Sequence, residues 1–332
     1  MMPAMRTLET PPRAIVGADG SPAFGSFSGP LPHVDLAPLR VSMLRRLAMR
    51  KRWVYVAIAN REVFVGLAIV DLGYATKTFA FVYRDGTLLS DRTALGPSTA
   101  GMVSDTIADG AHARFSREGA FAELRRQGGL IDVHARFPGL SLQARLDART
   151  NRPPLSAVGP IPGGVLNTTE KQALLTVTGE ARVAGARIPL DDAFGGYDYT
   201  HGLLARHTRW KWAYLLGHAT DGTRVGMNLV EGFLGERECG VWLDDALYPV
   251  GEGIFSFDEK RPLAPWNIRT TCGNVDLAFT PHALHAEEEN LVVVKSHFVQ
   301  PIGKYRGTLR AGGRAVTLDG VLGVAEDQDV LW

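Results

Sequence analysis

Residues 53–74 read WVYVAIANREVFVGLAIVDLGY, and they give the clearest indication of the fold class. Its two apolar runs are rich in β-branched and aromatic residues, and only three polar residues separate them. Residues of these types favour strands, and a short polar link between two such runs predicts an antiparallel hairpin. Residues 78–89, TFAFVYRDGTLL, repeat the pattern around Asp85-Gly86, a dipeptide typical of tight hairpin turns. This part of the chain is therefore predicted to be consecutive antiparallel strands.

The same pattern returns about 160 residues later, as an internal repeat would. The matched blocks are Trp53–Tyr55 with Trp212–Tyr214 (212 − 53 = 159), Val65–Asp71 with Val225–Glu231 (225 − 65 = 160) and Val82–Asp85 with Val241–Asp244 (241 − 82 = 159). A nearly constant shift, with a slip of one residue between blocks, is what duplication followed by a loop insertion produces. We therefore expect two copies of one antiparallel β domain.

An all-β fold follows, with two tandem barrels or sandwiches, because such closed forms leave few exposed sheet edges. Short helices are expected only at 39–50 and 116–126. The domains are predicted as an irregular N-terminal arm at 1–38, a first β domain at 39–150, an irregular Pro/Gly-rich passage containing a strand at 151–194, and a second β domain at 195–332.

Composition excludes several classes of protein. The 36 Lys and Arg balance 35 Asp and Glu, so the basic excess of a nucleic-acid binder is missing. The first residues, MMPAMRTLETPPR, lack the apolar core of a signal peptide, and the apolar run at 63–70 is too short to span a bilayer. Two cysteines without a CxxC motif suit a reducing compartment. We therefore expect a soluble, cytoplasmic protein without nucleic-acid partners or transmembrane segments.

Three segments carry a resemblance to a known family. They are KRWVYVAIA with its following strands, TRWKWAYLLGHATDGTRVGMNLVEG, and the terminal GVAEDQDVLW. Together they resemble the bacterial family called "domain of unknown function 2804". More distantly, the tandem β domains are similar to the carotenoid hydratase and AttH-like group, in which two lipocalin-like (calycin) barrels lie side by side. This second resemblance implies a terpenoid or other hydrophobic ligand.

The richest polar and aromatic cluster lies just before the second copy. Strand alternation places Trp210 and Trp212 on one face, and Asp198 and His201 precede them in the chain. Such a group could hold an apolar ligand beside a reactive carboxyl. Equally, the tryptophans could fill a barrel core while Asp198 and His201 cap a strand end.

Asn228 and Glu231 form the second candidate. Asn228 stands where the first copy has the apolar Ala68, and a polar amide in only one copy of a core strand needs a partner, which could be a ligand. Glu231 matches Asp71, and the repeated acid also suits a structural task at a strand end. Trp242 is a further candidate, because its ring could present an aromatic face to the same ligand. The acidic run Glu326–Asp329 is interpreted as a structural tail that packs back onto a barrel.

We therefore expect a protein that binds a hydrophobic small molecule such as a terpenoid or lipid, and transforms it in the manner of a hydratase, isomerase or cyclase. In that case the candidate catalytic acids are Asp198, His201 and Glu231. The candidate ligand-binding residues are Trp210, Trp212, Asn228 and Trp242. The alternative is a non-catalytic lipocalin-like lipid carrier or a structural interaction protein. His282 and His285 have a metal-like spacing, but their segment is interpreted as a charged turn, so no metal and no cofactor is expected. A cavity holding two or more acids would favour the enzyme.

Overall fold

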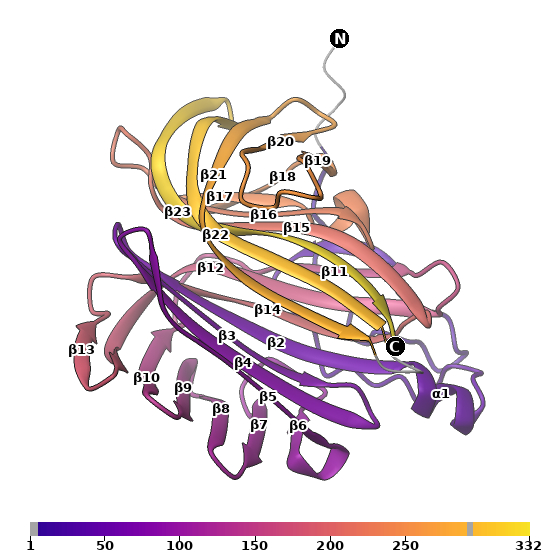
Figure 1. Ribbon diagram of the computed structural model, residues 1–332. Helices are drawn as coiled ribbons and strands as arrows, with labels where there is room; N and C mark the ends of the chain where they lie inside the picture. The colour runs from indigo at the N-terminus through magenta and orange to yellow at the C-terminus, as the bar shows by residue number, and fades with distance from the viewer. Residues whose placement is uncertain (1–5, 291–294) are drawn as a thin grey trace.

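The computed structural model describes residues 6–290 and 295–332, in which strands form two large antiparallel sheets (Figure 1). The first sheet contains the strands from β1 to β14, coloured indigo through magenta to rose, and the second, from β15 on and coloured salmon to yellow, lies above it in the view. Each sheet is strongly curled, as predicted for tandem barrel-like β domains. Within the described ranges, none of the helices has both the length and the apolar character needed to cross a membrane.

The first sheet has the strand order β5-β4-β3-β2-β14-β12-β10-β9-β8-β7-β6, with β1, β11 and β13 joined beside this path. It curls so that β6 and β7 pack against β3 and β4. Its elements, together with the helices in the same part of the chain, are β1 (Gly25–Ser28), α1 (Met43–Met49), β2 (Arg50–Ala59), β3 (Val63–Asp71), β4 (Ala75–Arg84), β5 (Thr87–Pro97), η1 (Ser98–Ala100), β6 (Gly101–Val103), β7 (His112–Arg117), β8 (Ala120–Gln127), β9 (Leu130–Phe137), β10 (Leu140–Asp147), β11 (Leu155–Pro160), β12 (Leu166–Val183), β13 (Ala186–Pro189) and β14 (Phe194–Leu203).

The second sheet has the order β18-β17-β16-β15-β23-β22-β21-β20-β19. Its elements are β15 (His207–His218), β16 (Arg224–Gly232), η2 (Gly235–Glu238), β17 (Gly240–Leu243), β18 (Ala246–Pro249), β19 (Gly253–Ser256), β20 (Trp266–Thr270), β21 (Val275–Asn290), β22 (Lys295–Ala311) and β23 (Arg314–Leu331).

Strand β2 is buried on both faces, and this explains its continuous apolar sequence. Val54 and Val56 belong to the core enclosed by the first sheet. The alternate residues Tyr55 and Ala57 belong to a second core, which they share with the facing strands of the second sheet. A strand covered on both sides has no polar face to present to water. The two sheets therefore pack against each other through β2 and its neighbours.

The two copies of the repeated segment occupy matching positions. Both sheets contain the same strand succession around their first hairpin, β4-β3-β2-β14-β12 in one and β17-β16-β15-β23-β22 in the other. The corresponding cross-strand partners are Trp53 with Val70 and Trp212 with Val230, then Arg52 with Asp71 and Lys211 with Glu231. This agreement is what the internal repeat predicts. The duplication itself and the exact domain boundaries remain predictions.

The structure differs from the sequence expectations at several elements. Residues 116–126, expected as a helix, form parts of β7 and β8, because their alternate residues are buried in the first core. β14 hydrogen-bonds to β2 and β12 of the first sheet, although most of its residues fall in the range expected for the second domain. The strand expected within the passage at 151–194 is β12, whereas the expected turn near His282 is part of β21. Residues 291–294 of an expected strand lie outside the described residues.

Candidate functional site

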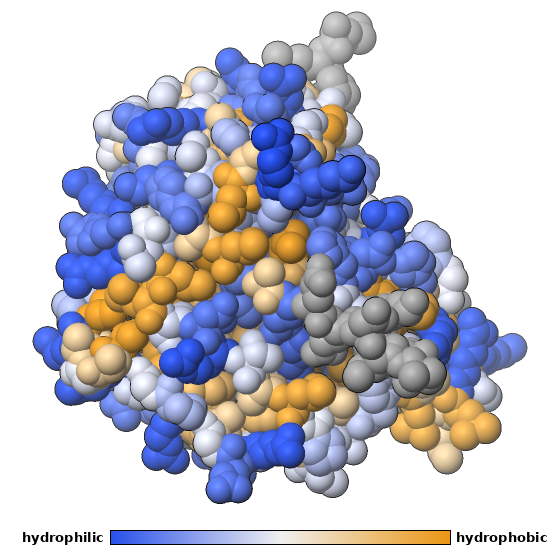
Figure 2. Space-filling model, viewed as in Figure 1, coloured by the Kyte–Doolittle hydropathy of each residue, from blue (hydrophilic) through white to orange (hydrophobic). Residues whose placement is uncertain are grey.

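A cavity of about 150 Å³ lies between the facing sides of the two sheets. β2, β3, β4, β12 and β14 form one wall, and β15, β16, β22 and β23 form the other. In the space-filling view of Figure 2, a band of apolar surface crosses the middle of the molecule. The cavity-lining residues used below are Trp53, Tyr55, Leu72, Lys171, Asp198, Thr200, Trp210, Trp212, Phe233, Glu238, Glu326 and Trp332.

Aromatic rings from both sheets make up one side of the cavity. The rings of Trp53 and Trp210 are stacked, with centroids 5.8 Å apart and planes 10° from parallel. Phe233 lies 5.3 Å from Trp210, and Trp212 meets Tyr55 edge-on at 5.2 Å. Strand alternation produces this arrangement, because Trp210 and Trp212 share a face of β15 while Trp53 and Tyr55 share the opposing face of β2. The cavity therefore offers flat apolar surfaces to a ligand.

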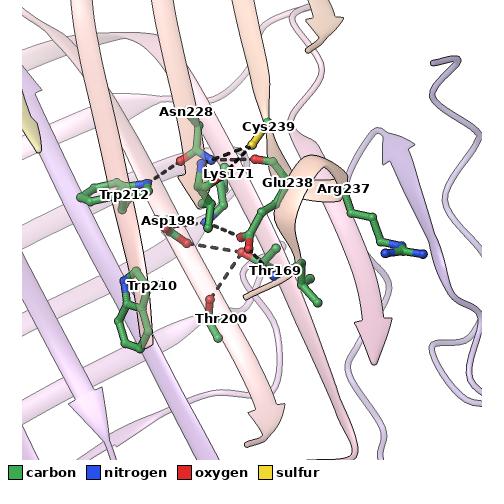
Figure 3. Close-up of polar contacts among 12 residues, drawn as sticks. Thr169, Lys171, Asp198, Thr200, Trp210, Trp212, Asn228, Arg237, Glu238 and Cys239 are labelled. Atoms are coloured by element: carbon green, nitrogen blue, oxygen red, sulfur yellow. Dashed lines mark hydrogen bonds and ion pairs between the residues drawn. The ribbon is translucent and has the colours of Figure 1, made fainter. Parts of the chain in front are cut away.

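A buried charged triad, Lys171, Asp198 and Glu238, also lines the cavity (Figure 3). Lys171 and Asp198 are direct cross-strand partners on β12 and β14, and the Lys171 Nζ lies 2.5 Å from Asp198 Oδ2 and 3.3 Å from Glu238 Oε2. Burial disfavours the ammonium, but the attraction of the two carboxylates outweighs it and raises the pKa of Lys171. The triad thus fixes one cation between two acids at the cavity wall.

Glu326 is the acid best suited to proton transfer. It lies on β23 opposite Trp212, and its side chain accepts hydrogen bonds from Trp210 Nε1 at 2.8 Å and from Gln300 Nε2 at 2.7 Å. Burial raises the pKa of Glu326 to about 7, and repulsion from Asp198 acts in the same direction. Near neutral pH a substantial fraction of this carboxyl is therefore protonated inside the cavity, as a general acid requires.

Three of the residues predicted from sequence line the cavity: Asp198, Trp210 and Trp212. Asn228 lies one layer behind them. It accepts a hydrogen bond from Trp212 Nε1 at 2.7 Å and donates one to the Glu238 carbonyl, also at 2.7 Å. Its amide therefore positions Trp212 and the turn that carries Glu238, and it does not face a ligand.

The other predicted residues lie elsewhere. His201 is three residues from Asp198 on the same strand, so it points to the opposite face, where burial lowers the pKa of its imidazole to about 3. Glu231 is partly exposed, pairs with Lys211 and accepts a hydrogen bond from the Phe255 amide. Trp242 is fully buried and donates to the Pro153 carbonyl. All three were candidates for the same ligand site as Asp198, and they do not line this cavity.

His282 and His285 have separate partners. His282 Nδ1 lies 2.8 Å from the Tyr83 hydroxyl, and His285 Nδ1 lies 2.9 Å from Asp91 Oδ1. Both contacts join β21 of the second sheet to β4 or β5 of the first. These histidines therefore link the two sheets beside the cavity.

Among the residues of the site that sequence reasoning missed are Trp53, Lys171, Glu238 and Glu326. Trp53 could have been found, because it is the repeat partner of Trp212. Glu326 could also have been suspected, since it stands in an acidic run between an apolar strand and a terminal tryptophan. No feature of the neighbouring sequence marks Lys171 or Glu238 as a site residue, because their burial depends on contacts between segments that are distant in the chain.

The chain belongs to the family described as "Domain of unknown function (DUF2804)", whose model matches residues 6–332. No relative among curated proteins matches its sequence.

Solved structures show the same fold at low sequence identity. The crystal structure of CghA with Sch210972 is 12% identical, with a TM-score of 0.55, and the match covers 96% of this chain and 97% of that one. Kievitone hydratase from Nectria haematococca is 12% identical, with a TM-score of 0.51 and coverage of 88% and 93%. A candidate AttH protein from Nitrosomonas europaea is 11% identical, with a TM-score of 0.51 and coverage of 86% and 96%. At these identities the similarity establishes the fold alone.

Proposed function

We propose that this member of the DUF2804 family binds a largely apolar small molecule in the cavity between its sheets and transfers a proton to it from Glu326. The observation that carries the proposal is the environment of Glu326. Its carboxyl is buried on the cavity wall, held by Trp210 and Gln300, and has a pKa raised by burial to about 7.

The aromatic side of the cavity supports an unsaturated or polycyclic apolar ligand. Flat hydrocarbon surfaces pack well against the stacked rings of Trp53 and Trp210. The same rings present their electron-rich faces, which attract a positive charge. A carbon centre that becomes cationic after protonation would be stabilised beside them.

The reaction class that fits these groups is the protonation of a carbon–carbon double bond. The Glu326 O–H bond breaks, its proton forms a new C–H bond, and the π electron pair supplies that bond and leaves a cationic neighbouring carbon. Water adding to that carbon completes a hydration; loss of a proton from an adjacent carbon completes an isomerisation. The released proton can pass to the Asp198 carboxylate, which Lys171 holds in place at 2.5 Å.

The structural neighbours are consistent with a small-molecule function. One is named a hydratase and another was crystallised with a bound compound. Their low identity transfers neither substrate nor mechanism to this chain, so the proposal depends on the cavity itself.

Carriage of a lipid without chemistry is the second candidate function, and the apolar side of the cavity favours it. A carrier, however, has no need for three buried acidic side chains and a buried lysine around its ligand, and burying such groups is energetically costly. The acids at the cavity wall therefore favour the enzyme.

Ligand binding can be tested with N-phenyl-1-naphthylamine, a neutral apolar probe whose fluorescence rises on transfer from water. We expect saturable binding that farnesol competes away. Trp53→Ala should weaken it by roughly tenfold, because it removes the ring stacked on Trp210, while both hydrogen-bond donors to Glu326, Trp210 and Gln300, remain in the chain. The matched control is Phe24→Ala, which removes a ring that is 47% exposed and outside the cavity. Absence of saturable binding, or equal binding by the two variants, would contradict the proposal.

A further inference from the structure

The short helix α1 exposes an unusual amount of apolar surface. Met43, Leu44 and Leu47 are 74%, 80% and 52% exposed, and Tyr74 in the turn after β3 is 48% exposed. In Figure 2 an apolar cluster stands out at the lower right, over α1 of Figure 1. Single exposed apolar residues are ordinary, but large side chains gathered on one short helix indicate a surface that something covers.

The surroundings of α1 are basic. Residues 36–50 contain no aspartate or glutamate and four arginines, Arg40, Arg45, Arg46 and Arg50. Arg40 and Arg45 are exposed beside the apolar side chains, and Arg50 is partly exposed at the end of the helix. Apolar side chains flanked by arginines are typical of segments that rest on an anionic lipid surface.

This surface is connected to the cavity through Lys51. The Lys51 Nζ donates to the carbonyls of Ala48 in α1, at 2.8 Å, and of Leu72, at 3.2 Å. It also lies over the rings of Tyr74 and Trp332, 5.3 and 5.8 Å from their centroids. Leu72 and Trp332 line the cavity. The end of α1 is therefore separated from the cavity wall by a single layer of side chains.

We propose that α1 and Tyr74 dock on an anionic lipid surface, with the apolar side chains inserted among the acyl chains and the arginines at the headgroups. Docking in this way places the cavity wall next to the bilayer, from which an apolar ligand could enter the cavity. Entry of a ligand from the bilayer rests on the proposed function, whereas docking on the lipid surface does not. A second copy of the chain is a poorer occupant, because a symmetric contact would bring two arginine-rich surfaces together.

The test is sedimentation of the full chain with vesicles, without any added ligand. We expect binding to vesicles of equal parts phosphatidylglycerol and phosphatidylcholine, weak binding to phosphatidylcholine alone, and release at high salt. The double variant Met43→Ser/Leu44→Ser should lose about tenfold or more in affinity. The control is Ile254→Ser/Leu263→Ser, whose side chains are 43% and 51% exposed in the second-sheet part of the chain.

Equal binding by the two double variants, or no binding of the unmodified chain, would overturn the proposal. The proposal would also be overturned if the chain did not bind vesicles and light scattering showed a dimer that only the α1 variant, Met43→Ser/Leu44→Ser, dissociates. Binding of N-phenyl-1-naphthylamine in free solution should be the same for the α1 variant and the unmodified chain. A loss of vesicle binding can therefore be distinguished from a failure of the cavity proposal.

Discussion

Replacing Lys171 with methionine should lower the free energy of unfolding by about 3–5 kcal/mol, because it leaves buried carboxylates without their cation. Lys171 is 2% exposed, and Glu238 and Asp198 are 1% and 7% exposed. With little water nearby, neither acid can replace the lost ammonium by hydration. Urea unfolding at neutral pH measures the change directly, since the midpoint should fall at an unchanged slope.

A matched control uses the ion pair at the surface of the second sheet. Lys211 Nζ lies 2.5 Å from Glu231 Oε1, the same distance as in the pair between Lys171 and Asp198, but its side chain is 23% exposed. Lys211→Met should cost no more than about 1 kcal/mol, because solvent screens exposed pairs. Neutralising both acids in the triple variant Lys171→Met/Asp198→Asn/Glu238→Gln should recover much of the loss. Similar costs for the two lysine substitutions would show that the triad is not a buried charge cluster.

Replacing Glu326 with glutamine should reduce proton transfer to carbon by about 10²–10⁴-fold, the usual contribution of a general acid. The amide keeps the size of the side chain and can still accept from Trp210, but it has no acidic proton to give. Because the substrate is not identified, the assay follows the proton. Terpenoid alkenes such as limonene, geraniol and squalene are incubated with the protein in D₂O, and mass spectrometry detects deuterium bound to carbon.

The control for this substitution is Asp327→Asn, on the same strand. Asp327 is the neighbour of Glu326 in the chain, so alternation turns it to the other face of β23. We expect it to keep the rate of deuterium incorporation within about threefold, since it removes no cavity-lining acid. Equal rates for the unmodified chain and Glu326→Gln would remove Glu326 from the mechanism. If both rates equal the rate without protein, ligand carriage is left as the function.

The fold could be predicted from sequence where the signal was local. The hairpin around Asn60 and the turn at Asp85-Gly86 are set by neighbouring residues, and the repeat identified two copies of the same strand pattern. Alternation also paired Trp210 with Trp212 correctly. Residues 116–126 were misjudged because a short amphipathic segment fits a helical pattern as well as an alternating one.

The candidate site was harder to predict, for two physical reasons. Asp198 and His201 were grouped because they are close in sequence, yet their odd spacing on a strand separates them onto opposite faces. Recognising β14 as one continuous strand would have prevented that error. Lys171 looks like a solvated charge in the sequence, and Glu326 was interpreted only as part of a structural tail. Each is buried because the facing sheet covers it, which is a long-range contact without a local signature.

Glu326 should be a carboxylic acid held partly neutral in the cavity at physiological pH. Carbon-13 NMR of glutamate side-chain carboxyls, with Glu326→Gln used to assign the signal, follows its titration. We expect a midpoint near pH 7, because burial and Asp198 both disfavour the anion. A midpoint near the ordinary glutamate value of about 4.3 would instead show an ionised, well-solvated carboxylate, and Glu326 could not then be the proton donor at neutral pH.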